Sequence, residues 1–410
     1  MVAARALPAW PLRVLLFGFP LFWIAGALPF VYMGIATLMV VLLVMRRSVS
    51  LVPGLLPYLA FVVWACASSV MVGSTGQMVG YLWRLGDLVA LGVVMLYYAS
   101  AREDLDIRTV VFGLTTVWAT TVVLGVLATQ LPDIRLTTPV GMLLPGAITS
   151  NDLVHDLVFP PLAEVQQPWG APVPYNRPAA PFPYANSWGV AYVLLTPVAV
   201  AAIGMARRAA ARVLLVVLLC VSVWPAIQTS NRGMFLGLAA VLAYVTVRLL
   251  LAGRLGQAMI TIGVGVLGAI GLVASGAVAA ILGRQEYSDS TGTRASIYRE
   301  TFDATLASPL LGWANPRNDA TIGVALGTQG YIWTLMYCFG FVGLALFLAF
   351  LAGSIVRTLR LGSVPDIWLH SVLIAALTII PFYGLGTTQL FTIALVAVAL
   401  LRRRAEQAPA

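Results

Sequence analysis

The chain has 410 residues, of which 60% are hydrophobic and only 10% are charged, and its mean hydropathy is +0.94. Soluble proteins carry about 25% charged residues, so a water-soluble globular protein is excluded. The net charge of +9 comes from arginine, since the sequence contains no lysine. These arginines stand in ones, twos and threes between apolar runs, a pattern that fits membrane topology signals and excludes a nucleic-acid-binding stripe.

Apolar stretches of roughly the length that crosses a bilayer follow one another along the chain. They predict about twelve membrane-spanning helices, and hence an all-α, polytopic membrane helical bundle that forms a single integral membrane domain over residues 1–410. The expected spans are residues 11–27, 29–45, 52–72, 78–100, 108–130, 185–205, 213–228, 233–251, 257–282, 330–352, 366–384 and 387–401.

An even number of spans places both termini on one side of the membrane. Most arginines between the spans then fall on that side, which the positive-inside rule identifies as the cytoplasm. The two long connections, residues 131–184 and 284–329, are expected outside the cytoplasm. The cytoplasmic connections are short and hold no phosphate-binding loop motif, which argues against an ATP-driven transporter and against a kinase.

The connection over residues 131–184 is rich in proline and aromatic residues, so it cannot form a long helix. It is either an ordered cover over the membrane, rich in extended segments, or a spacer. His155 is the only histidine expected outside the cytoplasm. It is a candidate proton acceptor, or else an ordinary surface residue.

The connection over residues 284–329 predicts a helix that is capped by Ser290 to Thr293 and continues to Leu306. On this helix Arg299 and Asp303 are four residues apart and could form an ion pair. Two roles are open for this helix. It either rests on the outer leaflet as an amphipathic segment, or it positions Arg294 to bind an anion together with Arg232 and Arg299.

Arg232 lies in a short polar break, residues 228–233, between two apolar runs. An arginine is disfavoured on the outer side, so its presence suggests a bound anion, and Gly233 would let that anion approach the backbone. The alternative is an arginine whose guanidinium extends to the membrane interface.

A few polar residues fall inside expected spans, where charge is costly. Arg84 and Asp87 share one helix face and form either a mutually neutralising pair or a substrate-facing site. His370 is expected to be an interfacial anchor. The three cysteines, which show no spacing typical of a disulfide framework or a zinc site, are expected to be buried small residues. They are Cys66, Cys220 and Cys338.

Four segments together resemble the O-antigen ligase and polymerase superfamily of bacterial envelope proteins. Residues 230–236 (Ser-Asn-Arg-Gly-Met-Phe-Leu) are similar to the family's Ser-x-Ser-Arg-Gly element, and Thr293-Arg294-x-x-x-Tyr298 is similar to its Arg-x-x-x-Trp. Residues 308–313 (Ser-Pro-Leu-Leu-Gly-Trp) and 337–344 (Tyr-Cys-Phe-Gly-Phe-Val-Gly-Leu) are similar to its Pro-Leu-Leu-Gly-x-Gly and Glu-x-Gly-Leu-Ile-Gly-Leu runs. The order and spacing match across residues 185–350.

The resemblance implies a multi-pass glycosyltransferase of the bacterial cytoplasmic (inner) membrane. It would transfer a glycan from a polyprenyl-diphosphate carrier to a lipid, a protein or another carrier-linked repeat. By motif, Arg232 and Arg294 would bind the donor diphosphate. We expect an inverting reaction that uses no cofactor, with no nucleic acid as partner. The expected outer side holds no Asp-x-Asp-like pair, so we expect no essential metal.

One departure from the family concerns the proton acceptor. Many ligases of the family have a histidine where this chain has Gln329, and an amide cannot act as a general base. A carboxylate such as Asp303, Asp289, Glu300 or Asp319 could take the proton, or the reaction could proceed without a strong base while Gln329 orients the acceptor. A lipid-linked glycan transporter and a non-catalytic scaffold remain the alternative functions.

Overall fold

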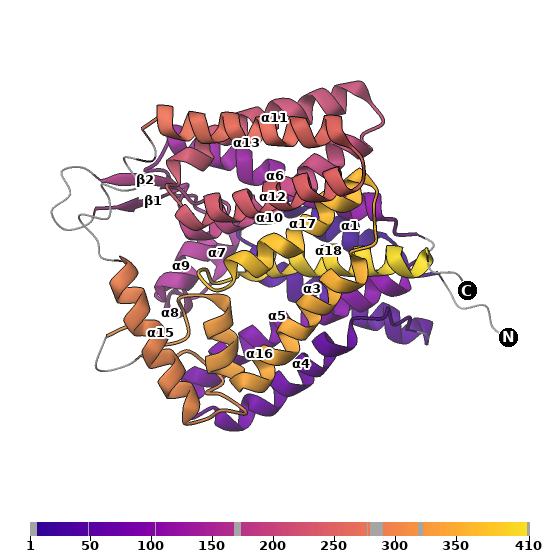
Figure 1. Cartoon of the computed structure of the whole chain (residues 1–410). Coiled ribbons are helices and arrows are strands. Elements are labelled where there is room, and N and C mark those ends of the chain that lie inside the picture. Colours follow the sequence, from indigo (N-terminus) through magenta and orange to yellow (C-terminus); the bar gives the residue numbers. More distant parts are fainter. Residues whose placement is uncertain are drawn as a thin grey trace.

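The computed structural model describes residues 6–47, 49–102, 104–167, 174–276, 278, 290–318 and 323–407, which fold into a bundle of helices (Figure 1). By length and composition, eight of these helices could cross a membrane. They are α3 Leu28–Arg46, α5 Thr75–Ser100, α6 Ile107–Gln130, α10 Ala185–Met205, α11 Ala209–Gln228, α12 Arg232–Leu251, α13 Leu255–Ala274 and α16 Tyr331–Thr358. The expected all-α, polytopic helical architecture is therefore confirmed.

Other expected spans take a different form. The first consists of two short helices, α1 Trp10–Phe17 and α2 Phe19–Ala25, because Gly18 ends one and Pro20 lies in the first turn of the next. The third is α4 Leu56–Ala67 followed by the 3-10 turn η1 Ser68–Met71. The last two are α17 Val364–Ile379, which ends five residues before the expected boundary at 384, and α18 Thr387–Glu406.

The helices α10 and α18 form the centre of the bundle. Every residue from Gln389 to Arg402 in α18 is buried, and α10 packs against α6 and α17. The part of α18 from Leu390 to Leu401 is apolar except for Thr392, and α10 is apolar along most of its length, as expected for helices enclosed by others. At the periphery, α13 buries only Ala258 and Thr261 and exposes a largely apolar surface, as a helix against lipid does.

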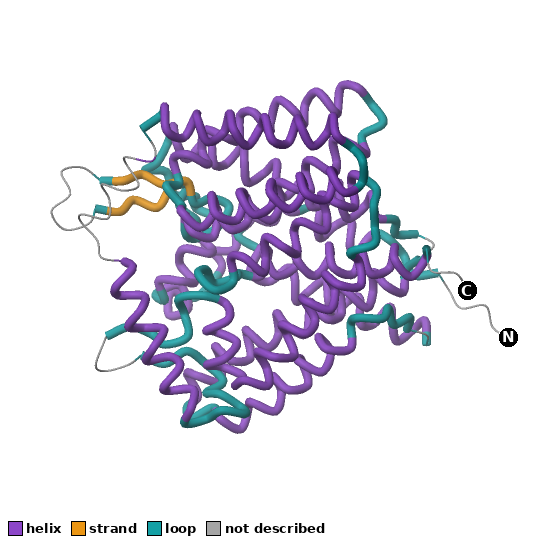
Figure 2. The backbone as a smooth tube through the Cα atoms, viewed as in Figure 1, coloured by secondary structure: helices purple, strands orange, loops and turns teal. Residues whose placement is uncertain are grey.

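The connection over residues 131–184 contains short elements. The helices are α7 Pro139–Leu143, α8 Gly146–Thr149 and α9 Asp152–Val158, and the strands β1 Ala163–Gln166 and β2 Tyr175–Pro178 form an antiparallel hairpin. In Figures 1 and 2 these elements lie at the same end of the bundle as α15 Ser290–Leu306, and the two chain termini lie at the other end.

Three polar or thiol side chains are placed differently from expectation. His370 is not an interfacial anchor: it is 1% exposed and hydrogen bonds through Nδ1 with the Tyr244 hydroxyl (2.6 Å) and through Nε2 with Ile355 O (2.9 Å). It thus joins α17 to α12 and α16. Cys338 is buried as expected, but Cys66 and Cys220 are exposed, and all three thiols are free.

Candidate functional site

The start of α12 is fixed by a side-chain cap. Asn231 precedes the helix, and its Oδ1 accepts a hydrogen bond from Met234 N (3.1 Å), the usual role of asparagine at this position. The preceding residue, Ser230, has a φ of 48°, which turns the chain sharply out of α11. Arg232 is therefore the first residue of α12 and lies at its N-terminus.

Tyr383, in the connection between α17 and α18, fills the space beside this helix start. Its hydroxyl accepts a hydrogen bond from Gly233 N (3.1 Å), and a Cβ atom at position 233 would lie 1.9 Å from its Cε2. Glycine is required here because the tyrosine ring occupies the side-chain position. The expectation that Gly233 leaves its backbone open to an anion is therefore wrong.

Arg294 lies over the aromatic ring of Tyr383. The guanidinium carbon of Arg294 is 5.7 Å from the ring centroid of Tyr383, within the range of a cation–π contact. Tyr383 thus contacts both α15, which carries Arg294, and the first turn of α12, which begins with Arg232. The structure brings the helices of the two expected diphosphate-binding arginines to one aromatic side chain.

The position of Tyr383 is set by main-chain hydrogen bonds to the start of α16. Tyr331 N donates to Tyr383 O (2.9 Å), and Ile332 N donates to Ile380 O (3.2 Å). Trp333 Nε1 also donates to Pro381 O (3.0 Å). The segment after α17 is therefore held against the first turn of α16.

Tyr298 closes the site on the α15 side. Its ring stacks on Trp333 with centroids 4.5 Å apart and planes 11° apart, and its hydroxyl donates to Gln329 O (3.3 Å). Burial raises the pKa of this hydroxyl, an effect that the nearby Arg294 opposes. The hydroxyl is thus a neutral donor at physiological pH, and the Gln329 contact that the structure defines is through the main chain.

The position of α15 relative to α16 is fixed by the segment that follows α15. Gly340 has a φ of 69° and interrupts α16, and a Cβ there would lie 2.0 Å from Leu310 O. At this break Phe341 N donates to Pro309 O (2.8 Å) and Trp313 N donates to Tyr337 O (2.7 Å). Two of the segments that resemble the ligase and polymerase superfamily therefore pack directly on each other.

Arg299 and Asp303 lie on another face of α15. Ile297 and Thr301 point into the protein, whereas Arg299 and Asp303 are exposed. At about 100° per residue, Arg294 falls within one side-chain width of the buried face, and the exposed pair falls nearly opposite. Among the described side chains no ion pair joins Arg299 to Asp303, so the expected pairing does not form. The structure does not bring either residue to Tyr383.

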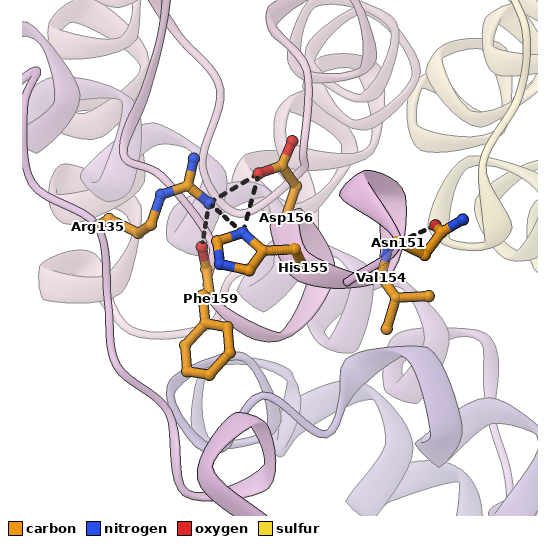
Figure 3. Close-up of polar contacts among 6 residues, drawn as sticks. All are labelled: Arg135, Asn151, Val154, His155, Asp156 and Phe159. Atoms are coloured by element: carbon orange, nitrogen blue, oxygen red, sulfur yellow. Dashed lines mark hydrogen bonds and ion pairs between the residues drawn. The ribbon is translucent and has the colours of Figure 1, made fainter. Parts of the chain in front are cut away.

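His155 belongs to a separate surface cluster on α9 (Figure 3). Arg135 Nη1 donates to Asp156 Oδ1 (2.7 Å) and to Phe159 O (2.7 Å), and it lies 3.2 Å from His155 Nδ1. Nδ1 of His155 therefore faces both the Arg135 guanidinium and the Asp156 carboxylate, and the cluster is separate from Tyr383.

Arg84 and Asp87 form no direct ion pair in the described part of the chain. Arg84 Nη1 donates to Asn315 Oδ1 (2.8 Å) and to Ala314 O (3.3 Å), whereas Asp87 Oδ2 accepts from Thr387 Oγ1 (2.8 Å). Arg84 therefore connects α5 to the segment that follows α15, and Asp87 connects α5 to the start of α18.

Sequence reasoning missed Tyr383 because it lies in an apolar segment without a motif. Asp289 and Asp319, the other loop carboxylates considered as bases, lie outside the described residues, and Glu300 is exposed. The described residues contain no cluster of three or more histidine, cysteine or acidic side chains that could hold a metal ion. Comparison with protein-family models and with curated protein sequences finds no match.

Proposed function

We propose that the chain is a membrane glycosyltransferase of O-antigen ligase or polymerase type. It takes a glycan from a polyprenyl-diphosphate carrier and passes it to an acceptor outside the cytoplasm, in the assembly of a cell-envelope polysaccharide. In this proposal the bundle has about twelve spans in the bacterial inner membrane, with both termini in the cytoplasm, as the distribution of arginines favours. The bundle end that carries α15 and the β1–β2 hairpin then faces outward.

The observation that carries the proposal is the position of Tyr383 between Arg294 and the first turn of α12. The two arginines come from segments that are separate in the sequence and that resemble two elements of one family. Guanidinium groups bind phosphate oxygens in a bidentate manner and keep their charge at every physiological pH. Two of them beside one helix end are suited to a diphosphate at the membrane surface.

The chemistry that these groups support is substitution at the anomeric carbon. A bond forms between the acceptor hydroxyl oxygen and that carbon, while the bond from the carbon to the diphosphate oxygen breaks and its electron pair leaves with the diphosphate. Arg232 and Arg294 stabilise the charge that develops on the leaving group. With Gln329 in place of a base, departure of the diphosphate leads the reaction, and the acceptor oxygen gives up its proton late, to a water molecule or to an oxygen of the departed diphosphate.

Alanine substitution tests the proposal. Arg232→Ala and Arg294→Ala should each abolish transfer from a polyprenyl-diphosphate oligosaccharide by the purified protein while leaving its amount in the membrane unchanged. Arg254→Ala is the control, since Arg254 is an exposed arginine before α13 at the far end of α12. Normal transfer by both variants would refute the arginine site.

The same preparation separates transfer from transport. Reconstitution into vesicles that contain the lipid-linked oligosaccharide allows both product formation and movement of the lipid between leaflets to be measured. Movement of the oligosaccharide lipid without transfer to any acceptor would favour a lipid-linked glycan transporter, which also needs a diphosphate site.

A further inference from the structure

Arg177 on β2 is buried although it carries a full charge. Only 3% of its surface is exposed, and it lies in the hairpin formed by the connection over residues 131–184. Removing a guanidinium from water is costly unless its donors are satisfied. The contacts of Arg177 therefore indicate what this hairpin holds in place.

The guanidinium of Arg177 reaches the end of α11. Its Nε donates to Thr229 O (2.7 Å), and Thr229 is the residue that ends α11. Its Nη2 donates to Asn186 Oδ1 (3.0 Å) at the start of α10. A cation at a helix C-terminus satisfies carbonyl groups that have no partner within the helix and interacts favourably with the helix dipole.

The same network reaches the other end of the turn between α11 and α12. Asn231 is 2% exposed and caps α12, and its Nδ2 lies 3.5 Å from Asn186 Oδ1, the atom that also accepts from Arg177. Between the two ends Ser230 has a φ of 48°. Residues other than glycine rarely adopt this backbone conformation, and they keep it only where the surrounding structure fixes it.

We infer that Arg177 is a positioning residue, which holds the turn from Thr229 to Asn231 and so fixes the direction in which Arg232 is presented to an anion. The inference rests on the proposed function, because it identifies that anion as the diphosphate of the carrier lipid. It also gives the proline-rich connection a part in the site, because its β1–β2 hairpin holds the turn that precedes Arg232.

The test uses the full-length protein in lipid nanodiscs and polyprenyl diphosphate without a sugar as the probe. Arg177→Met keeps much of the side-chain volume but removes the donors. It should speed hydrogen exchange of the amides over residues 229–235 about tenfold and weaken probe binding about tenfold, as loss of a hydrogen bond from a charged donor implies. Arg177→Lys should recover part of both effects, since its ammonium still reaches a carbonyl with fewer donors.

Arg402→Met is the matched control. Arg402 is 6% exposed and donates to two main-chain carbonyls, Tyr98 O (3.1 Å) and Arg102 O (2.9 Å), near the other end of the bundle. Its replacement should lower the melting temperature as the loss of any buried arginine does, without changing exchange over residues 229–235 or probe binding.

A double variant shows whether Arg177 acts through Arg232. In an Arg232→Ala background, Arg177→Met should still speed exchange but should cause no further loss of probe binding. The inference would be overturned if the losses of probe binding caused by Arg177→Met and Arg232→Ala multiply in the double variant. It would also be overturned if amide hydrogen exchange over residues 229–235 stays slow in Arg177→Met. Faster exchange with unchanged probe binding would also overturn it while leaving the proposed function intact. Probe binding that depends on both arginines in a protein that transfers no glycan would refute the proposed function alone.

Discussion

Replacement of Gly233 by alanine is the sharpest perturbation of the contact between α12 and Tyr383. The added Cβ would lie 1.9 Å from Cε2, 2.6 Å from Cζ and 2.7 Å from the hydroxyl oxygen of Tyr383. To restore an ordinary contact of 3.4 Å, the ring has to retreat by about 1.5 Å. The hydrogen bond from Gly233 N to the Tyr383 hydroxyl, now 3.1 Å, is then lost.

The expected cost follows from these two effects. Overpacking of this kind costs about 1–3 kcal/mol, and the lost hydrogen bond adds about 1 kcal/mol. Alanine is the better helix former by about 1 kcal/mol, which offsets part of the loss. We therefore expect Gly233→Ala to destabilise the protein by roughly 1–3 kcal/mol and, since the displaced ring also contacts Arg294, to weaken donor binding at least tenfold.

Thermal unfolding in detergent and the Michaelis constant for the lipid-linked donor are the measurements. Gly263→Ala on α13 is the control, because a Cβ at Gly263 meets no atom within 4 Å and should leave both quantities unchanged or raise stability slightly. The double variant Gly233→Ala/Tyr383→Ala should regain stability relative to Gly233→Ala, since the ring that clashes is gone. Wild-type stability and donor binding in Gly233→Ala would show that Tyr383 does not occupy this space.

Two further predictions concern the same site. Tyr383→Phe removes the acceptor of the Gly233 N–H but keeps the ring beside Arg294, so donor affinity should fall only a few-fold, whereas Tyr383→Ala should lower it more than tenfold; equal effects in a titration of the two variants would contradict the cation–π contact. Treatment with a chelator should leave the transfer rate unchanged, and a rate that falls and recovers with added Mg²⁺ would rule out leaving-group stabilisation by arginine alone.

The sequence predicts the parts of this site that depend on local pattern. The capping pattern of Ser290 to Thr293 predicts a helix through Arg294 to Leu306, and this helix is confirmed as α15. The polar break that precedes Arg232 likewise marks the start of α12. A local signal does not specify which face of α15 turns inward, and so Arg299 and Asp303 were grouped with Arg294 although they are exposed.

Contacts between residues that are far apart in the chain cannot be predicted from the sequence pattern. Tyr383 lies 150 positions from Gly233, in a segment with no charge and no recognisable pattern. Arg84 and Asp87 show the same difficulty. Their spacing on one helix favours a pair, but each finds a partner far along the chain, in Asn315 and Thr387, at a distance that no local pattern encodes.

The contacts of Gly233 also change how an anion can be held at α12. Helix N-termini bind phosphate through main-chain amides that lack partners. Here the amide of Gly233 donates to the Tyr383 hydroxyl and that of Met234 donates to Asn231 Oδ1, so both are already used. In the proposed function, binding of the diphosphate at this helix start then depends mainly on the guanidinium groups of Arg232 and Arg294. That dependence is why the removal of either side chain is expected to abolish transfer rather than to weaken it.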